Sequence, residues 1–127
     1  MSTFTVEAPP VLVVDDDAAV RRTMAKFLDH SGFEVVEADN GQVALTYLQD
    51  GGKASVIVLD LRMPIMDGFA FRKAQRLDPV LCDIPVIILS GADTDRFGEL
   101  DAAATFEKPA SFTTILNCVK QLAKRPQ

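Results

Sequence analysis

Three short runs of consecutive apolar residues, at positions 11–14, 56–59 and 86–89, limit the possible folds of this chain more than any other feature of its sequence. Their length and their many branched side chains are typical of strands. Because no polar residue alternates with the apolar ones, each strand needs apolar cover on both of its faces. Helices that connect parallel strands provide that cover.

Between these runs, apolar residues recur at the spacing of a helix. Helices are predicted over residues 18–30, from residue 41 to the glycines at 51 and 52, over 69–77, and over 111–124. Weaker strand patterns at 33–38 and 105–107 complete a strand–helix order that runs through five strands. Since crossovers between parallel strands are right-handed, the simplest fold is of the α/β class, a doubly wound five-stranded parallel sheet.

The composition is that of one small acidic domain. Thirteen lysines and arginines against eighteen aspartates and glutamates give a formal net charge of −5. This charge disfavours direct binding to nucleic acid or to an anionic membrane surface. The two cysteines have no metal-site spacing, and residues 1–10 carry no secretory signal, so we expect reduced thiols and a cytoplasmic protein. Residues 1–10 are expected to form a flexible segment, and residues 11–127 the domain.

Polar residues with reactive or ligating side chains follow four of the five predicted strands. Asp15 and Asp16 follow the first strand, Asp60 the third, Ser90 the fourth and Lys108 the fifth. The carboxyl ends of parallel strands open onto one shared crevice, where ligands bind in open α/β sheets. We therefore expect these five side chains to lie close together.

This set of side chains is suited to phosphoryl transfer. Three converging carboxylates repel one another unless a cation lies between them, and hard oxygen ligands suit Mg²⁺. A lysine and a hydroxyl beside them suit an anion made of oxygens, and a carboxylate can act as the nucleophile. The alternative is helix capping, which accounts for any one of these residues taken alone but not for the whole set.

Four motifs in this chain resemble those of the receiver domains of two-component response regulators. They are VLVVDDD with the two arginines that follow it, VIVLDLRMPIMDG, IILSGAD and FEKPA, and the match runs from about residue 11 to residue 124. The resemblance implies a flavodoxin-like (βα)5 fold with the strand order 2-1-3-4-5.

The resemblance also implies a phosphorylation site with its metal. Asp60 matches the phosphoacceptor, which takes a phosphoryl group from a histidine of a sensor kinase or of a histidine phosphotransfer protein. Asp15 and Asp16 match the acidic pair that holds Mg²⁺, and Asp60 and the backbone carbonyl of Arg62 match the other protein ligands.

Three further positions take their expected roles from the same resemblance. Lys108 would pair with the Asp60 carboxylate and then with the phosphoryl oxygens, and its peptide bond to Pro109 matches one that is commonly cis. Ser90 matches the hydroxyl that moves toward the phosphoryl group after transfer. Asp17 lies outside the metal pair, and capping of the following helix explains it better.

Two departures from the family pattern concern the signalling face. Thr105 stands where an aromatic residue is common, and the adjacent Phe106 is expected to point inward. Ser90 and Lys108 are 108 − 90 = 18 positions apart, about one helical turn less than is usual in the family. We therefore expect a fourth helix that is short, irregular or mobile.

Together these features predict a stand-alone receiver domain, a switch that catalyses only its own phosphorylation and dephosphorylation. Its expected partners are the phosphodonor and a downstream protein target, without nucleic acid or membrane, and it is expected to be a monomer or weak dimer. Two alternatives stay open. Asp15 and Asp17 also resemble the short nucleophile motif of haloacid-dehalogenase-type phosphohydrolases, in which Asp15 rather than Asp60 would be phosphorylated. The third possibility is an interaction module that is no longer phosphorylated.

Overall fold

The fold alternates strands with helices along the chain. The structure, a computed structural model, describes residues 9–91 and 100–123. Its strands are β1 (Val11–Val14), β2 (Val35–Ala38), β3 (Val56–Asp60), β4 (Val86–Ser90) and β5 (Ala104–Glu107). Its helices are α1 (Ala18–His30), α2 (Gly41–Gln49), α3 (Gly68–Leu77) and α5 (Phe112–Ala123). Within these described ranges, no helix has the length and apolar character that crossing a membrane would require.

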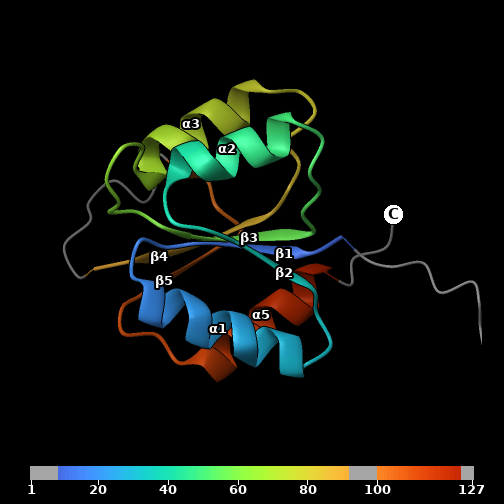
Figure 1. Cartoon of the computed structure of the whole chain (residues 1–127), viewed down its shortest axis with the longest axis vertical. Coiled ribbons are helices and arrows are strands. Elements are labelled where there is room, and N and C mark those ends of the chain that lie inside the picture. Colours follow the sequence, from blue (N-terminus) through green and yellow to red (C-terminus); the bar gives the residue numbers. More distant parts are fainter. Residues whose placement is uncertain (1–8, 92–99, 124–127) are drawn as a thin grey trace, which may run out of the picture.

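The five strands form one parallel sheet in the order β2-β1-β3-β4-β5. Helices α2 and α3 cover one face of the sheet, and α1 and α5 cover the other (Figure 1). The predicted doubly wound, flavodoxin-like fold and its strand order are confirmed. Because the strands are parallel, their carboxyl ends lie along a single edge of the sheet, which we call the carboxyl edge.

The uninterrupted apolar runs are explained by two separate cores, one on each side of the sheet. In β1, Leu12 and Val14 belong to the core beneath α2 and α3, whereas Val11 and Val13 belong to the core beneath α1 and α5. All four side chains are buried. An apolar residue is therefore needed at every position of this strand, and strict alternation with polar residues is absent.

Three helices begin at the carboxyl edge with a side-chain cap. The carboxylate or amide oxygens of Asp17, Asn40 and Asp67 accept hydrogen bonds from the backbone N–H three residues later, at 3.1, 3.0 and 2.9 Å. Such caps satisfy N–H groups that have no partner within the helix. The predicted capping role of Asp17 is confirmed. The carboxylate of the neighbouring Asp16 remains available to the site.

The second strand is shorter than the sequence predicts. It begins at Val35 rather than at Phe33, because the N–H of Phe33 donates to the Leu28 carbonyl at 3.1 Å and so extends the end of α1. In β5, the prediction that Phe106 points inward is confirmed. Phe106 packs against the core beneath α1 and α5, while Thr105 is exposed. The expected flexible segment and fourth helix fall largely on residues 1–8 and 92–99, which lie outside the described residues.

Candidate functional site

Three carboxylates meet at the carboxyl edge, where β1 and β3 end side by side. Val14 of β1 pairs with Leu59 of β3 in the sheet. Asp15 follows Val14 and Asp60 follows Leu59, so this pairing brings the two aspartates together. Carboxylate oxygens of Asp15, Asp16 and Asp60 all lie within 4.8 Å of one another. Asp15 and Asp60 are buried, whereas Asp16 is exposed. This acidic cluster has the geometry and the donor chemistry to hold a metal ion.

Lys108 brings a positive charge to the same cluster. Its Nζ lies 3.2 Å from Asp60 Oδ1 and 3.4 Å from Asp15 Oδ2. Its backbone N–H donates to the Ser90 carbonyl at 2.6 Å, which ties the end of β5 to the end of β4. The peptide bond between Lys108 and Pro109 is cis, as predicted. The ammonium group thus contacts both buried carboxylates at once.

Ser90 and Arg62 lie on the two segments that flank the cluster. Ser90 is the last residue of β4 and is fully buried, and its hydroxyl donates to the Gly91 carbonyl at 3.0 Å. Arg62 follows Asp60 by two residues in the loop between β3 and α3, and its backbone N–H donates to the Asp60 carboxylate. All the predicted site residues therefore lie at the carboxyl edge. The centre of the site is formed by four of them, Asp15, Asp16, Asp60 and Lys108.

The surroundings of Asp60 make its ionisation unfavourable. Burial, followed by the negative charge of Asp15, raises the pKa of Asp60 from 3.8 to about 6. The Lys108 ammonium and the hydrogen bonds from Lys108 and from the Arg62 backbone act in the opposite direction but are outweighed. A cation placed among the three carboxylates would relieve the same repulsion.

The environment of Lys108 favours its charged form. Partial burial lowers its pKa, but the carboxylates of Asp60 and Asp15 outweigh burial and leave the pKa of Lys108 above 10.5. The side chain is therefore an ammonium ion at neutral pH. It can act as a fixed positive charge toward an oxygen anion placed beside Asp60.

A second layer of contacts, which sequence reasoning missed, holds Asp15 in place. The Arg21 guanidinium donates to the backbone carbonyl of Asp15 and to the Glu37 carboxylate, both at 2.9 Å. The backbone N–H of Asp17 donates to Asp15 Oδ1 at 2.9 Å. In the sequence, Arg21 is one of the two arginines that follow the motif VLVVDDD. The opposite charges of Arg21 and Glu37 were the available signal, but a separation of sixteen positions along the chain hid their contact.

Gly68 is a second residue whose role was missed. A Cβ atom on Gly68 would lie 2.6 Å from the backbone oxygen of Asp60 and 2.8 Å from the Cα of Leu61. The Gly68 N–H also donates to the Leu61 carbonyl at 2.9 Å, which closes the loop between β3 and α3. The start of α3 is therefore packed directly on the backbone of the phosphoacceptor candidate. In the sequence, Gly68 is the last residue of the motif VIVLDLRMPIMDG, and nothing in that motif indicates this close approach.

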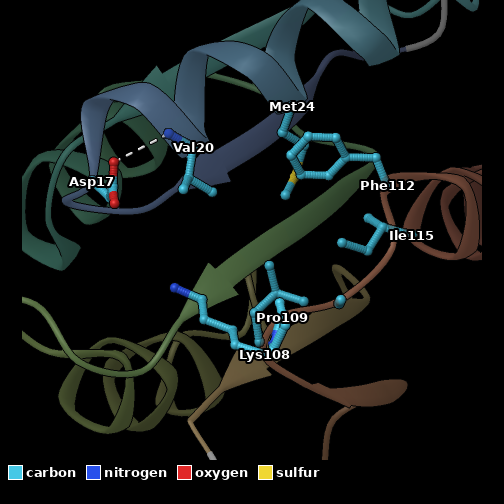
Figure 2. Close-up of a pocket in the computed structure, with 9 residues that line it drawn as sticks. Asp17, Val20, Met24, Lys108, Pro109, Phe112 and Ile115 are labelled. Atoms are coloured by element: carbon cyan, nitrogen blue, oxygen red, sulfur yellow. Dashed lines mark hydrogen bonds between the residues drawn. The ribbon is translucent and has the colours of Figure 1, made fainter.

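An apolar pocket of about 440 Å³ adjoins the acidic cluster on the side of α1 and α5. Figure 2 shows Asp17 and Lys108 at one end of this pocket and Met24, Phe112 and Ile115 at the other. The pocket lies between α1 and the chain that leads from β5 into α5. The site thus has a polar centre and an apolar flank.

Comparison with known sequences assigns the chain to a family. A model of the response regulator receiver domain matches residues 11–120. The transcriptional regulatory protein PrrA of Mycobacterium tuberculosis is 38% identical over 125 residues, which cover 94% of this chain and 52% of PrrA. The response regulator MprA of Mycolicibacterium vanbaalenii is 32% identical over 119 residues, which cover 91% of this chain and 50% of MprA. The chain spans about half the length of these curated relatives.

Solved structures agree with this assignment. The receiver domain of a signal transduction histidine kinase from Syntrophus aciditrophicus matches with a TM-score of 0.86 at 28% identity, covering 94% of this chain and 96% of that one. The chemotaxis response regulator CheY4 of Vibrio cholerae matches with a TM-score of 0.81 at 28% identity, covering 91% and 98%. With its parallel five-stranded fold and the acidic cluster at the carboxyl edge, this chain belongs to the family of response regulator receiver domains.

Proposed function

We propose that the chain is a phosphorylation-controlled switch in which Asp60 accepts a phosphoryl group from a phosphohistidine. The donor would be a sensor histidine kinase or a histidine phosphotransfer protein. The observation that carries the proposal is the position of the buried Asp60 carboxylate, 3.2 Å from the Lys108 ammonium and within 4.8 Å of the Asp15 and Asp16 carboxylates. A nucleophile, a fixed cation and a metal-binding cluster are the parts that phosphoryl transfer to a carboxylate requires.

In the proposed step, an Asp60 carboxylate oxygen forms a bond to phosphorus as the bond between phosphorus and the donor nitrogen breaks. The electron pair of the broken bond stays with the imidazole of the donor. Asp60 must be ionised to attack, and a pKa of about 6 leaves most of the carboxylate ionised at neutral pH. Lys108 is positioned to compensate the charge of the transferred oxygens, because its Nζ already contacts Asp60 Oδ1.

The donor set at the carboxyl edge fits Mg²⁺. The carboxylates of Asp15, Asp16 and Asp60 would hold the ion, together with the backbone carbonyl of Arg62. All of these ligands are oxygens, which Mg²⁺ prefers. When bound, the ion supplies positive charge beside the phosphoryl oxygens. The protein's own part is to hold the three carboxylates together against their mutual repulsion.

The output of the switch is proposed to be contact with a downstream protein. Ser90 is the switch hydroxyl in this proposal, and it lies on the strand that Lys108 joins through its backbone. The working unit would be residues 11–127 as a monomer or weak dimer in the cytoplasm, without direct contact to nucleic acid or membrane. The free thiols of both cysteines support the cytoplasmic location.

Labelling with acetyl phosphate tests the proposal. Wild type, Asp60→Asn and the control Asp83→Asn, which changes an exposed carboxylate outside the acidic cluster, would be incubated with Mg²⁺, and the adduct located by peptide mapping. We expect an acyl phosphate on Asp60 in wild type and in the control but none in Asp60→Asn. An adduct on Asp15 would instead support the hydrolase alternative. A domain that is labelled at neither position, and that does not bind beryllium fluoride with Mg²⁺, would be an interaction module.

A further inference from the structure

The side chain of Arg21 connects the first turn of α1 to the ends of β1 and β2. Its Nη1 donates to the backbone carbonyl of Asp15 and its Nε to Glu37 Oε1, both at 2.9 Å. A guanidinium can make both bonds at once because its donors form a rigid planar fork. The N–H of Asp15 donates to the Ala38 carbonyl at 3.1 Å. The backbone of Asp15 is therefore held from both sides, by the sheet and by α1.

The two neighbouring carboxylates of the acidic cluster differ in how they are held. Asp15 is buried, and its Oδ1 accepts a hydrogen bond from the Asp17 N–H at 2.9 Å. Its Oδ2 lies 3.4 Å from the Lys108 ammonium. Asp16 is exposed, and among the described residues no hydrogen bond or ion pair holds its carboxylate. The chain bends at Asp16, between β1 and α1. The place of the Asp16 carboxylate in the cluster therefore depends on its backbone.

The peptide unit between Asp15 and Asp16 links Arg21 to that exposed carboxylate. The carbonyl of Asp15 and the N–H of Asp16 belong to one planar group. A rotation of this group that breaks the bond to Arg21 also changes the direction of the Asp16 side chain. We propose that Arg21 is a positioning residue for the metal ion. By holding the Asp15 carbonyl, it keeps the Asp16 carboxylate within reach of the ion that the acidic cluster binds. This inference rests on the proposed function.

Glu37 explains how a positively charged residue can serve beside a cation site. A guanidinium alone would repel a divalent ion bound at the acidic cluster. The Glu37 carboxylate, 2.9 Å from Arg21 Nε, compensates that charge. The pair thus provides a hydrogen bond to the site without adding net charge. Arg21 and Glu37 should therefore affect Mg²⁺ binding through different causes, position for Arg21 and charge for Glu37.

Titration of the isotope-labelled protein with MgCl₂, followed by NMR of the backbone amides, measures the dissociation constant of the folded chain without any phosphoryl transfer. In Arg21→Met the bond to the Asp15 carbonyl is lost, and Mg²⁺ should bind about tenfold more weakly at low and at high salt. Loss of a positive charge alone would have the opposite effect. Arg21→Lys keeps the charge but lacks the fork, so it should also weaken binding, by about threefold.

Two further variants separate charge from position. Glu37→Gln keeps an acceptor for Arg21 Nε but leaves the guanidinium charge uncompensated. Mg²⁺ should bind this variant about threefold more weakly at low salt and like wild type near about 1 M KCl, where charges are screened within about 3 Å. Arg22→Met is the matched control, because it removes the same charge from the next, exposed arginine, which lines a pocket beside Glu37. It should bind Mg²⁺ no more weakly than wild type.

Wild-type affinity in both Arg21 variants would overturn the inference. Tighter binding in Arg21→Met would also overturn it, because Arg21 would then act only through its charge. A lower Tm with an unchanged dissociation constant would reduce Arg21 to a structural role, since the titration observes the folded protein. An equal loss in Arg22→Met would assign the effect to the charge of the helix. If Mg²⁺ did not shift the amide signals of Asp15, Asp16 and Asp60 in wild type, the metal site of the proposed function would itself be refuted.

Discussion

The guanidinium of Arg72, on α3, donates a hydrogen bond of 2.7 Å from Nε to the carbonyl of Leu100, 28 residues further along the chain. Its other nitrogens donate to the Asp101 carbonyl at 2.6 Å and to the Gln75 side chain at 2.7 Å. Gln75 in turn donates to the carbonyls of Leu81 and Ile84. This network fixes the chain that enters β5 to α3, the helix that follows Asp60, and Lys108 is the residue directly after β5.

Replacement of Arg72 by methionine should destabilise the domain by about 2–4 kcal/mol, because it leaves buried oxygens without their donors. The matched control is Arg76→Met, one turn further along α3. Arg76 is half-exposed and contacts the Asp101 carboxylate at 3.7 Å, so its loss should cost less than about 1 kcal/mol. Urea unfolding measures both free energies of unfolding. Equal losses for the two variants would contradict the anchoring role of Arg72.

The raised pKa of Asp60 predicts a stability that depends on pH. Because the pKa rises from 3.8 to about 6 on folding, ionisation of Asp60 disfavours the folded state. In metal-free buffer, the free energy of unfolding should therefore decrease as the pH rises from 4 to 6, because Asp60 ionises more readily in the unfolded chain. Above pH 6 the contribution of Asp60 should no longer change with pH. Asp60→Asn should therefore be more stable than wild type at pH 8, by on the order of 1–3 kcal/mol, and the difference should vanish near pH 4. Urea unfolding at both pH values measures it, and a difference that does not change with pH would contradict the assignment.

Added Mg²⁺ should reverse part of this destabilisation. An ion that binds only the folded acidic cluster raises Tm as its concentration increases. We expect Asp15→Asn to lose most of this rise in thermal melts at neutral pH. Asp17→Asn is the control two residues away, since asparagine caps a helix as well as aspartate does and Asp17 is not part of the cluster. A rise that is the same in Asp15→Asn as in Asp17→Asn would exclude the cluster as the metal site.

The strand ends of the site could be predicted from the sequence because they depend on local patterns and one rule of topology. Asp15 directly follows the apolar strand β1, and Asp60 is the last residue of the apolar strand β3. Parallel strands bring such positions to one edge of the sheet. The strand order itself came from the family resemblance, since apolar runs do not say which strands are neighbours. Lys108 could be predicted both from its place after the fifth strand and from the family resemblance.

The contacts that support the site could not be predicted because they depend on distances between elements. Arg72 and Gln75 lie at helical spacing on the buried side of α3. From the sequence alone, a polar residue is expected to be exposed unless its hydrogen-bond partners are known. Their partners are backbone carbonyls, which have no signature in a sequence. The contact between Arg21 and Glu37 and the close approach of Gly68 were hidden for the same reason.

Gly68→Ala should damage the phosphorylation site although alanine favours helices. The new Cβ would meet the Asp60 backbone oxygen at 2.6 Å and the Leu61 Cα at 2.8 Å, and neither can move without displacing the end of β3. We expect a destabilisation of about 1–3 kcal/mol and a loss of acetyl phosphate labelling at Asp60. Gly91→Ala is the matched control directly after β4, where a Cβ would meet nothing within 4 Å among the residues that the structure describes. If Gly68→Ala were labelled as fast as Gly91→Ala, the position of Asp60 would not depend on the packing of α3 against its backbone.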